Sequence, residues 1–228
     1  MFHWQAGILP GVSAAFTDTA AGNLALHVGD DPSLVLQRRR QLEAEMGIAA
    51  GSLKFMNQVH GATVAVADGT PVPEADAMVS LGTPLAVMVA DCIPLLLAGV
   101  SASGPVLSAV HAGRPGLEAG IVPAAVSRMR AMGAADIRAW LGPSICGRCY
   151  EVPEGLQEQV AAAVPAAKTT TSWGTPGLDL PAGARSQLED AGVGVEYSGP
   201  CTLEAESLYS YRRNNSTGRF AGVIWCHD

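Results

Sequence analysis

The chain has 228 residues, of which 48% are hydrophobic and 15% are charged, so it holds enough apolar material for the core of one α/β domain. A formal net charge of −7 argues against binding to nucleic acid or to an anionic membrane surface, but it permits a small anion at a local basic site. The odd number of cysteines, five, argues against a disulfide framework. Because residues 1–10 also lack the pattern of a signal peptide, we expect a cytoplasmic protein.

Helical and strand patterns alternate along the chain. In chain order we expect a helix over 33–46, strands at 63–67, 85–90 and 106–110, a helix over 117–132, a strand at 138–141, helices near 154–164 and 180–191, and closing strands at 193–197 and 222–226. The segment 161–177 is rich in Ala, Thr and Pro, and we interpret it as a surface excursion. This alternation predicts an α/β fold in a single domain over residues 1–228.

The most apolar stretch runs from Pro84 to Val100, and Asp91 interrupts it. A carboxylate at that place, next to a cysteine and a proline, makes a membrane span unfavourable. We therefore expect this stretch to be a buried strand, and we expect no membrane partner for the chain.

Three short segments each place a metal-binding side chain at the end of an apolar run. They are Asn57-Gln58-Val59-His60-Gly61, Ala90-Asp91-Cys92-Ile93-Pro94 and Val110-His111-Ala112-Gly113. Two imidazoles and one thiolate suit the borderline softness of zinc, and they leave a fourth position open, as in catalytic sites. No spacing rule supports residues so far apart, and the alternative is a pair of hydrogen-bonded histidines beside a small buried cysteine.

Several motifs in register carry a family resemblance. They are Asn23-Leu24 with Val28-Gly29-Asp30-Asp31-Pro32, Gln58-Val59-His60-Gly61, Ala90-Asp91-Cys92-Ile93-Pro94, His111-Ala112-Gly113, Gly142-Pro143-Ser144-Ile145 with Cys149-Tyr150-Glu151-Val152, and Ser210-Tyr211-Arg212-Arg213 with Thr217-Gly218-Arg219. In this order they resemble the YfiH/laccase-domain family, formerly called multicopper polyphenol oxidases. That family also includes a vertebrate purine-metabolism enzyme and a peptidoglycan-editing factor. The resemblance covers nearly the whole chain.

The resemblance implies a fold, a metal centre and an activity. The implied fold is a layered α-β-β-α sandwich with two central mixed sheets. The implied metal ligands and catalytic residues are His60, Cys92 and His111, with zinc as the metal and copper as the alternative. The implied activity is that of a purine nucleoside phosphorylase that also deaminates adenosine and acts on methylthioadenosine, so the partners are a nucleoside and phosphate. The sequence does not indicate the oligomeric state.

Phosphate and nucleoside need further side chains beside the metal. The family usually carries Asn-Arg at the positions of Arg38 and Arg39, and a guanidinium offers a fork of donors to phosphate oxygens, so Arg39 is the leading phosphate contact. A solvated helical face is the alternative for this arginine. The further candidates for substrate binding are Asn23, His27, Cys149 and Arg213.

Two neighbours of these candidates are assigned other roles. Asp91 precedes Cys92, and adjacent side chains of a strand face opposite sides, so we expect Asp91 to support the site before acting as an acid or base. Cys146 forms a CxxC pattern with Cys149, but no second CxxC exists to complete a zinc ribbon, and we treat Cys146 as incidental. For His27, the alternative to substrate binding is a histidine that only forms hydrogen bonds within its loop.

The chain departs from the family pattern at two places. Where the family usually has His-Ala-Gly-Trp-Arg-Gly, this chain has His-Ala-Gly followed by Arg114-Pro115-Gly116. Where the family usually has Thr-Arg near the N-terminus, this chain has Thr17-Asp18. Each change removes a cation, so a catalytically impaired metal-binding protein is one alternative function. A peptidoglycan-editing amidase acting on muramyl-amino-acid precursors is a second. A copper-dependent polyphenol oxidase is a third, although five histidines supply few imidazoles for coupled copper centres.

Overall fold

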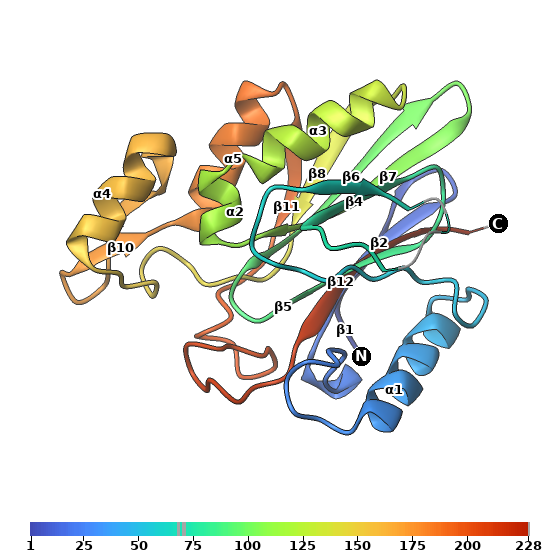
Figure 1. Ribbon diagram of the computed structural model, residues 1–228, viewed down its shortest axis with the longest axis horizontal. Helices are drawn as coiled ribbons and strands as arrows, with labels where there is room; N and C mark the ends of the chain where they lie inside the picture. The colour runs from blue at the N-terminus through green and yellow to red at the C-terminus, as the bar shows by residue number, and fades with distance from the viewer. Residues whose placement is uncertain (68, 70–71, 228) are drawn as a thin grey trace.

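The computed structural model describes residues 1–67, 69 and 72–227 (Figure 1). The helices are α1 (Pro32–Glu45), α2 (Arg114–Glu118), α3 (Ile121–Ala131), α4 (Glu154–Ala163) and α5 (Leu180–Asp190), with short 3-10 turns η1 (Thr19–Ala21) and η2 (Pro165–Ala167). The strands are β1 (Phe2–Leu9), β2 (Val12–Thr17), β3 (Val64–Val66), β4 (Ala77–Ser80), β5 (Leu85–Val89), β6 (Ile93–Ser101), β7 (Gly104–Ala112), β8 (Ala135–Leu141), β9 (Lys168–Thr170), β10 (Pro176–Leu178), β11 (Gly194–Ser198) and β12 (Phe220–Cys226).

Two sheets organise the described part of the chain. A six-stranded mixed sheet has the order β11-β8-β6-β7-β4-β3, with parallel pairs at both edges. A four-stranded sheet has the order β1-β2-β12-β5, and all its pairs are antiparallel. Strands β9 and β10 form a separate antiparallel pair. The α/β class expected from the alternating patterns is confirmed.

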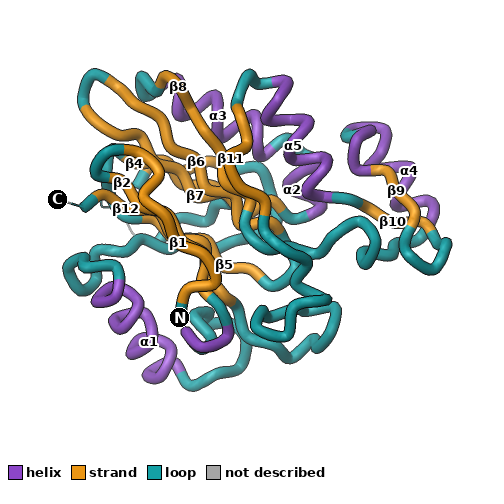
Figure 2. The backbone as a smooth tube through the Cα atoms, turned by 180° about the vertical axis from the view of Figure 1, so that it is seen from behind, coloured by secondary structure: helices purple, strands orange, loops and turns teal. Residues whose placement is uncertain are grey.

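Three hydrophobic clusters occupy the spaces between helices and sheets. One lies between the six-stranded sheet and α2, α3 and α5, the second between the two sheets, and the third between the four-stranded sheet and α1. Strand β6 serves two of them, because Leu95 and Leu97 face the helices while Leu96 and Ala98 face the other sheet. Helix α1 consequently lies on the opposite side of the molecule from α3 and α5 (Figures 1 and 2).

The apolar stretch from Pro84 to Val100 is two strands rather than the one expected. Strand β5 ends at Val89 in the four-stranded sheet, and β6 begins at Ile93 in the six-stranded sheet. The chain crosses from one sheet to the other at the turn between them, where Asp91 adopts a left-handed φ of 89°. This crossing places Cys92 at the junction of the two sheets.

Two other expectations need correction. The helix expected over 117–132 is divided into α2 and α3, because Gly120 adopts a left-handed φ of 82° between them. The segment 161–177, expected as a surface excursion, contains the end of α4, η2, β9 and the start of β10. None of the helices in the described ranges is long and apolar enough to cross a membrane.

Candidate metal centre and substrate pocket

The three predicted metal ligands come together from three different parts of the fold. His60 lies in the loop before β3, Cys92 in the turn between β5 and β6, and His111 near the end of β7. Their ligand atoms all lie within 4.8 Å of one another, and Cys92 Sγ is 4.0 Å from His60 Nε2. The His111 side chain is buried, whereas His60 is exposed to the cavity described below. The three atoms are therefore close enough to share one ion.

Asp76, at the start of β4, holds two of these ligands in place. Its buried carboxylate accepts a hydrogen bond from His111 Nδ1 at 2.8 Å, from the His60 backbone N–H at 2.9 Å and from the Gly61 backbone N–H at 2.6 Å. Because Nδ1 of His111 donates to Asp76, Nε2 carries the lone pair that can bind a metal. Sequence reasoning missed Asp76, although a single Asp in the apolar segment Ala75–Val79 is a signal for such a role.

The charges of the three ligands are coupled. Burial opposes ionisation of the Cys92 thiol, but the neighbouring imidazoles of His111 and His60 outweigh it and lower its pKa to about 6. Burial also opposes a charge on His111, but Cys92 and Asp76 raise its pKa to about 9. At neutral pH a negative sulfur thus lies beside a positive imidazole, and a divalent cation competes with the His111 proton for the same site.

Gly113 leaves the space that a cation needs between the ligands. A Cβ at this position would lie 3.0 Å from His60 Cδ2 and 3.1 Å from Cys92 Sγ. Its φ of −77° and ψ of 168° are open to any residue, so the close approach of the ligands, rather than the backbone, requires glycine here. Two imidazoles, one thiolate and this open corner fit a zinc ion bound by three protein ligands.

We expect Gly113→Ala to weaken metal binding without unfolding the protein. The added methyl group crowds His60 and Cys92, and overpacking of this kind costs roughly 1–3 kcal/mol. The apparent dissociation constant of the metal should therefore rise about tenfold or more. The measurement is a competition titration against a chelator, with Gly155→Ala as control, because a Cβ on Gly155 meets no atom within 4 Å. Unchanged affinity in Gly113→Ala would contradict this account of the ligand set.

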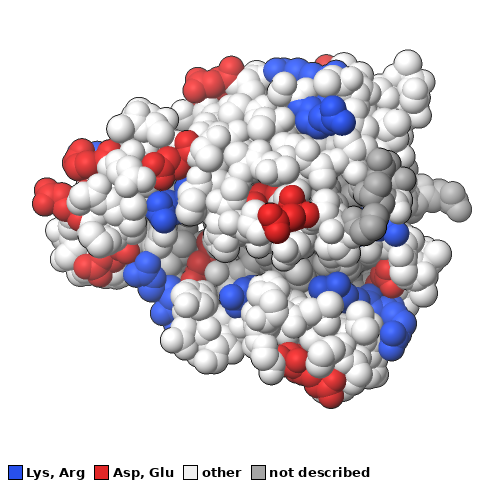
Figure 3. Space-filling model, in the orientation of Figure 1, with Lys and Arg blue, Asp and Glu red and all other residues white. Residues whose placement is uncertain are grey.

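The three ligands line a cavity of about 510 Å³ that also carries positive charge and aromatic rings. Arg114, Arg212 and Arg219 all contribute to its lining. The guanidinium of Arg212 lies 5.1 Å from the ring centre of Tyr150, and that of Arg219 lies 5.8 Å from the ring centre of Tyr211. A groove crosses the face shown in Figure 3, with Lys and Arg side chains along its edge. The cavity thus offers cations and flat apolar surfaces beside the candidate metal site.

His27 and Asp91 also line this cavity. Burial lowers the pKa of His27, and the nearby charges of Arg219, Arg39 and His60 lower it further, so its imidazole is neutral at pH 7. The Asp91 carboxylate accepts hydrogen bonds from Thr202 Oγ1 at 2.6 Å and from the Arg212 backbone N–H at 2.7 Å. Asp91 therefore anchors two points of the segment between β11 and β12, which agrees with the supporting role expected for it.

Asn23 and Arg39, both predicted to bind substrate, are not part of this lining. The buried Asn23 side chain binds the backbone of Ala25 and accepts the Arg219 N–H at 2.9 Å, so it positions the segment that carries Arg219. Arg39 Nε donates to the Leu24 carbonyl at 2.9 Å, and its guanidinium lies 3.7 Å from the Phe55 ring centre in a second cavity. Burial lowers the pKa of Arg39 to about 10. A phosphate contact of Arg39 stays a prediction.

Arg213 and Cys149, the other two predicted substrate contacts, also lie outside the lining. The Arg213 guanidinium donates to backbone carbonyls of the loop before it, those of Thr202, Leu203, Ala205 and Leu208. It therefore holds that loop together, while its neighbour Arg212 lines the cavity. Cys149 is buried in a separate cluster of cysteines, and its neighbour Tyr150 lines the cavity. In both pairs the residue adjacent to the predicted one, Arg212 or Tyr150, lines the cavity.

The departures from the family pattern have a structural outcome. Arg114 begins α2 and lines the cavity, so a cation is present just after the His-Ala-Gly segment. Pro115 occupies the first turn of that helix, where a missing N–H costs nothing. Asp18 pairs with the amino group of Met1 at 3.5 Å and caps the Ala20 N–H, away from the cavity lining.

Three candidate metal ligands in an arginine-lined cavity indicate the class of a candidate mononuclear metalloenzyme. Residues 5–227 match the family described as multi-copper polyphenol oxidoreductase laccase, and the chain belongs to this family. A Streptomyces coelicolor protein named purine nucleoside phosphorylase is 47% identical over 97% of this chain and 98% of its own length. The crystal structure of a Neisseria meningitidis protein matches with a TM-score of 0.85 and 31% identity over 99% of both chains. That of Bacillus licheniformis YfiH matches with a TM-score of 0.83 and 26% identity over 94% of this chain and 92% of its own. The resemblance to the YfiH/laccase-domain family is confirmed.

Proposed function

We propose that this chain is a zinc-dependent purine nucleoside phosphorylase that also deaminates adenosine and phosphorolyses methylthioadenosine. The observation that carries the proposal is that His60, Cys92 and His111 line the same cavity as three arginines and two tyrosines. The name of the Streptomyces coelicolor relative supports the same reaction class. The reduced thiols that its chemistry requires suit a cytoplasmic enzyme.

The cavity matches the chemistry of a nucleoside and phosphate. Its volume of about 510 Å³ lies within the range of small-molecule sites. The rings of Tyr150 and Tyr211 offer faces for a purine base, and Arg114, Arg212 and Arg219 offer guanidinium donors for phosphate. The overall negative charge of the chain makes this local positive lining the natural place for an anion.

The residues of the chain have separate tasks in this reaction. In phosphorolysis a phosphate oxygen forms a bond to the anomeric carbon of ribose while the bond from that carbon to the base breaks, and the electron pair leaves with the base. The arginines hold the phosphate in line and balance its charge. The neutral imidazole of His27 accepts a hydrogen bond from a ribose hydroxyl. His60, Cys92 and His111 would hold a zinc ion, which would supply a Lewis acid beside these groups.

Zinc fits the donor set better than a coupled copper centre does. A multicopper oxidase needs many imidazoles, and this chain has five histidines, of which two are in the proposed ligand set. One isolated copper ion also accepts two imidazoles and a thiolate, so metal analysis of the purified protein must measure both elements.

The arginine lining gives a specific prediction about phosphate. We expect Arg114→Ala, Arg212→Ala and Arg219→Ala each to raise the KM for phosphate about tenfold, because each removes a charge-assisted hydrogen bond to the anion. The assay follows release of the free base from adenosine and inosine at varied phosphate. Arg40→Ala is the matched control, since Arg40 is exposed on α1 and lies outside the cavity lining.

The same assay separates the proposal from its rivals. Hydrolysis of a muramyl-amino-acid substrate, with no base or inosine formed from adenosine, would replace the phosphorylase by the amidase. One bound zinc per chain with no turnover of any nucleoside would instead support a metal-binding protein without catalysis. Oxidation of a polyphenol by the copper-loaded protein alone would favour the oxidase.

A further inference from the structure

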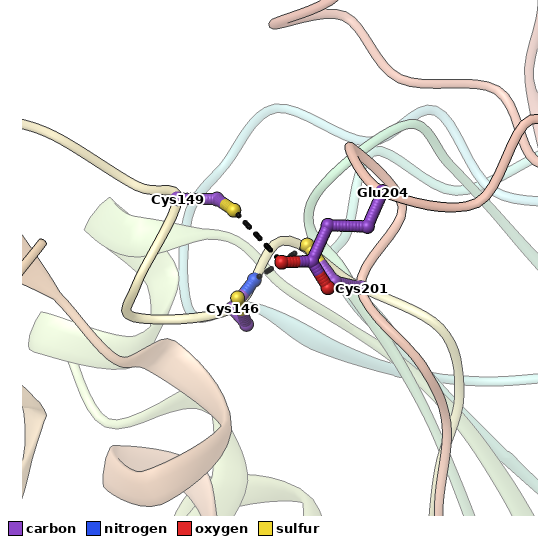
Figure 4. Close-up of side chains that lie close together, drawn as sticks. All are labelled: Cys146, Cys149, Cys201 and Glu204. Carbon is purple, nitrogen blue, oxygen red and sulfur yellow. Dashed lines mark hydrogen bonds between the residues drawn. The ribbon is translucent and has the colours of Figure 1, made fainter. Parts of the chain in front are cut away.

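A second group of metal-binding side chains lies outside the cavity. Cys146, Cys149, Cys201 and Glu204 have ligand atoms that all lie within 4.8 Å of one another (Figure 4). Cys146 and Cys149 lie in the loop after β8, and Cys201 and Glu204 lie in the loop after β11. These three thiols and the carboxylate do not line the cavity and have no part in the proposed reaction. Their close approach therefore points to another role.

The sheet explains why the two loops meet. Strands β8 and β11 are parallel neighbours, so their carboxyl ends lie at the same edge of the six-stranded sheet. The Ser144 N–H donates to the Pro200 carbonyl at 3.2 Å, and the Thr202 N–H donates to the Ser144 carbonyl at 3.0 Å. These bonds fix the loops side by side. Cys201 therefore lies beside the CxxC pair although it is 52 residues beyond Cys149 in the chain. No local sequence motif reveals a contact at this separation.

The backbone around the cluster holds the cysteines close together and places an N–H donor at one sulfur. The Cys146 N–H donates to Cys201 Sγ at 3.4 Å, and the nearby backbone N–H groups of Leu203 and Glu204 act to lower the pKa of that thiol. On the other loop, the N–H groups of Cys149 and Tyr150 both donate to the Cys146 carbonyl at 3.0 Å, which closes a tight turn. Burial raises the pKa of the Cys149 and Cys201 thiols, and the backbone donors oppose that rise at Cys201.

We propose that Cys146, Cys149, Cys201 and Glu204 bind a second zinc ion, which has a structural role. Three thiolates and a carboxylate form a closed four-ligand set of the kind found in structural sites, without an open position for substrate. With Zn–S bonds of about 2.3 Å, a tetrahedral site has sulfur–sulfur distances of about 3.8 Å, so no pair of these sulfurs, all within 4.8 Å of one another, needs to approach by more than about 1 Å. Arg148 lies 3.6 Å from the Glu204 carboxylate and offsets part of the negative charge of the ligands.

This second site stabilises the wall of the substrate cavity. Ile145 and Tyr150, which flank the CxxC turn, both line the cavity. On the other loop, Thr202 follows Cys201 directly and donates to Asp91, which lies next to the ligand Cys92. A zinc ion that joins the two loops therefore positions both sides of this wall. Its residues act through these neighbours and do not touch the substrate.

Metal content measures the second site directly. The protein is purified without chelator, under reducing conditions, and its zinc is measured by elemental mass spectrometry. We expect two equivalents in the wild type, one in Cys201→Ser and one in Cys146→Ser. The control is Cys226→Ser, which should keep two, because Cys226 lies in β12 away from both clusters. The double variant His60→Ala/Cys92→Ala removes the first site and should keep one equivalent.

A spectroscopic measurement covers the case in which a cysteine variant does not fold. Cobalt(II) in the otherwise wild-type His60→Ala/Cys92→Ala protein should give the strong sulfur-to-metal absorption of a tetrahedral site with three thiolates. Wild-type protein with a single zinc, all of it lost in the double variant, would overturn the proposal. A thiol titration that finds two of the five cysteines joined as a disulfide in the freshly purified protein would also overturn it. Retention of one zinc in the double variant, with no nucleoside turnover in the wild type, would reject the proposed function alone.

Discussion

Replacing His60, Cys92 or His111 by alanine should remove the metal from the cavity and reduce kcat/KM for nucleoside by at least about 10³-fold. Each variant deletes one of three ligands whose atoms lie within 4.8 Å of one another, and two ligands hold zinc poorly. Cys92→Ala should have the largest effect on affinity, because its thiolate is the only ligand of the three that carries a negative charge. The measurements are zinc content and base release from adenosine with phosphate.

The controls for this prediction use the same residue types elsewhere. His3→Ala alters an exposed histidine on β1, and Cys226→Ser alters a cysteine outside both clusters, so both should keep wild-type metal and activity. Circular dichroism and thermal melting establish that the alanine variants are folded. If all three ligand variants keep the metal content of the wild type, the triad does not form the site.

The sequence alone indicates the three candidate ligands, whereas the groups that support them are found only from three-dimensional proximity. Each ligand ends an apolar run and belongs to a family motif, so both patterns pointed to the same residue. Asp76 lies 16 residues after His60 and 35 before His111, and it comes beside them because β4 pairs with β7 on one side and with β3 on the other. The requirement for glycine at 113 is likewise visible only once the ligand atoms surround it.

The substrate residues show a different limit. The motifs contain residues that line the cavity, but which of two adjacent residues faces it depends on the local backbone. Arg213 turns inward to bind loop carbonyls while Arg212 lines the cavity, and the pair Cys149 and Tyr150 divides in the same way. Arg39 is taken up by the Leu24 carbonyl and the Phe55 ring, contacts that a helical pattern cannot anticipate.

The secondary structure missed from the sequence has identifiable causes. Strands β1 and β2 form a hairpin around Pro10-Gly11, a dipeptide that is typical of turns. Gly11 adopts a left-handed φ of 70° in this turn. Strands β5 and β6 follow one another in one apolar run, because buried strands lack the alternation that marks a boundary. The left-handed turn at Asp91 divides them, and only the sheet pairing shows it.

We expect Asp76→Asn to have the second large effect, on stability and metal affinity together. The buried carboxylate accepts hydrogen bonds from His111 Nδ1 and from the backbone N–H groups of Val59, His60 and Gly61. The Asn side chain has the same shape as Asp, but its NH₂ group cannot accept hydrogen bonds. At least one or two of these donors therefore lose their acceptor, and each loss lowers the free energy of unfolding by roughly 1–3 kcal/mol. The melting temperature should fall by about 5–10 °C for a loss of about 3 kcal/mol.

Asp76→Asn should also release the orientation of the His111 imidazole, and this effect distinguishes it from a variant that is only less stable. Without Asp76, His111 is no longer fixed with Nε2 toward the metal, and loss of such a supporting carboxylate weakens metal binding by about 10- to 100-fold. Chelator competition at a temperature where the variant is folded measures this effect separately from melting. Asp190→Asn, an exposed carboxylate at the end of α5, should change neither quantity. A variant that melts early yet binds zinc as tightly as the wild type would show that Asp76 supports the fold and not the metal centre.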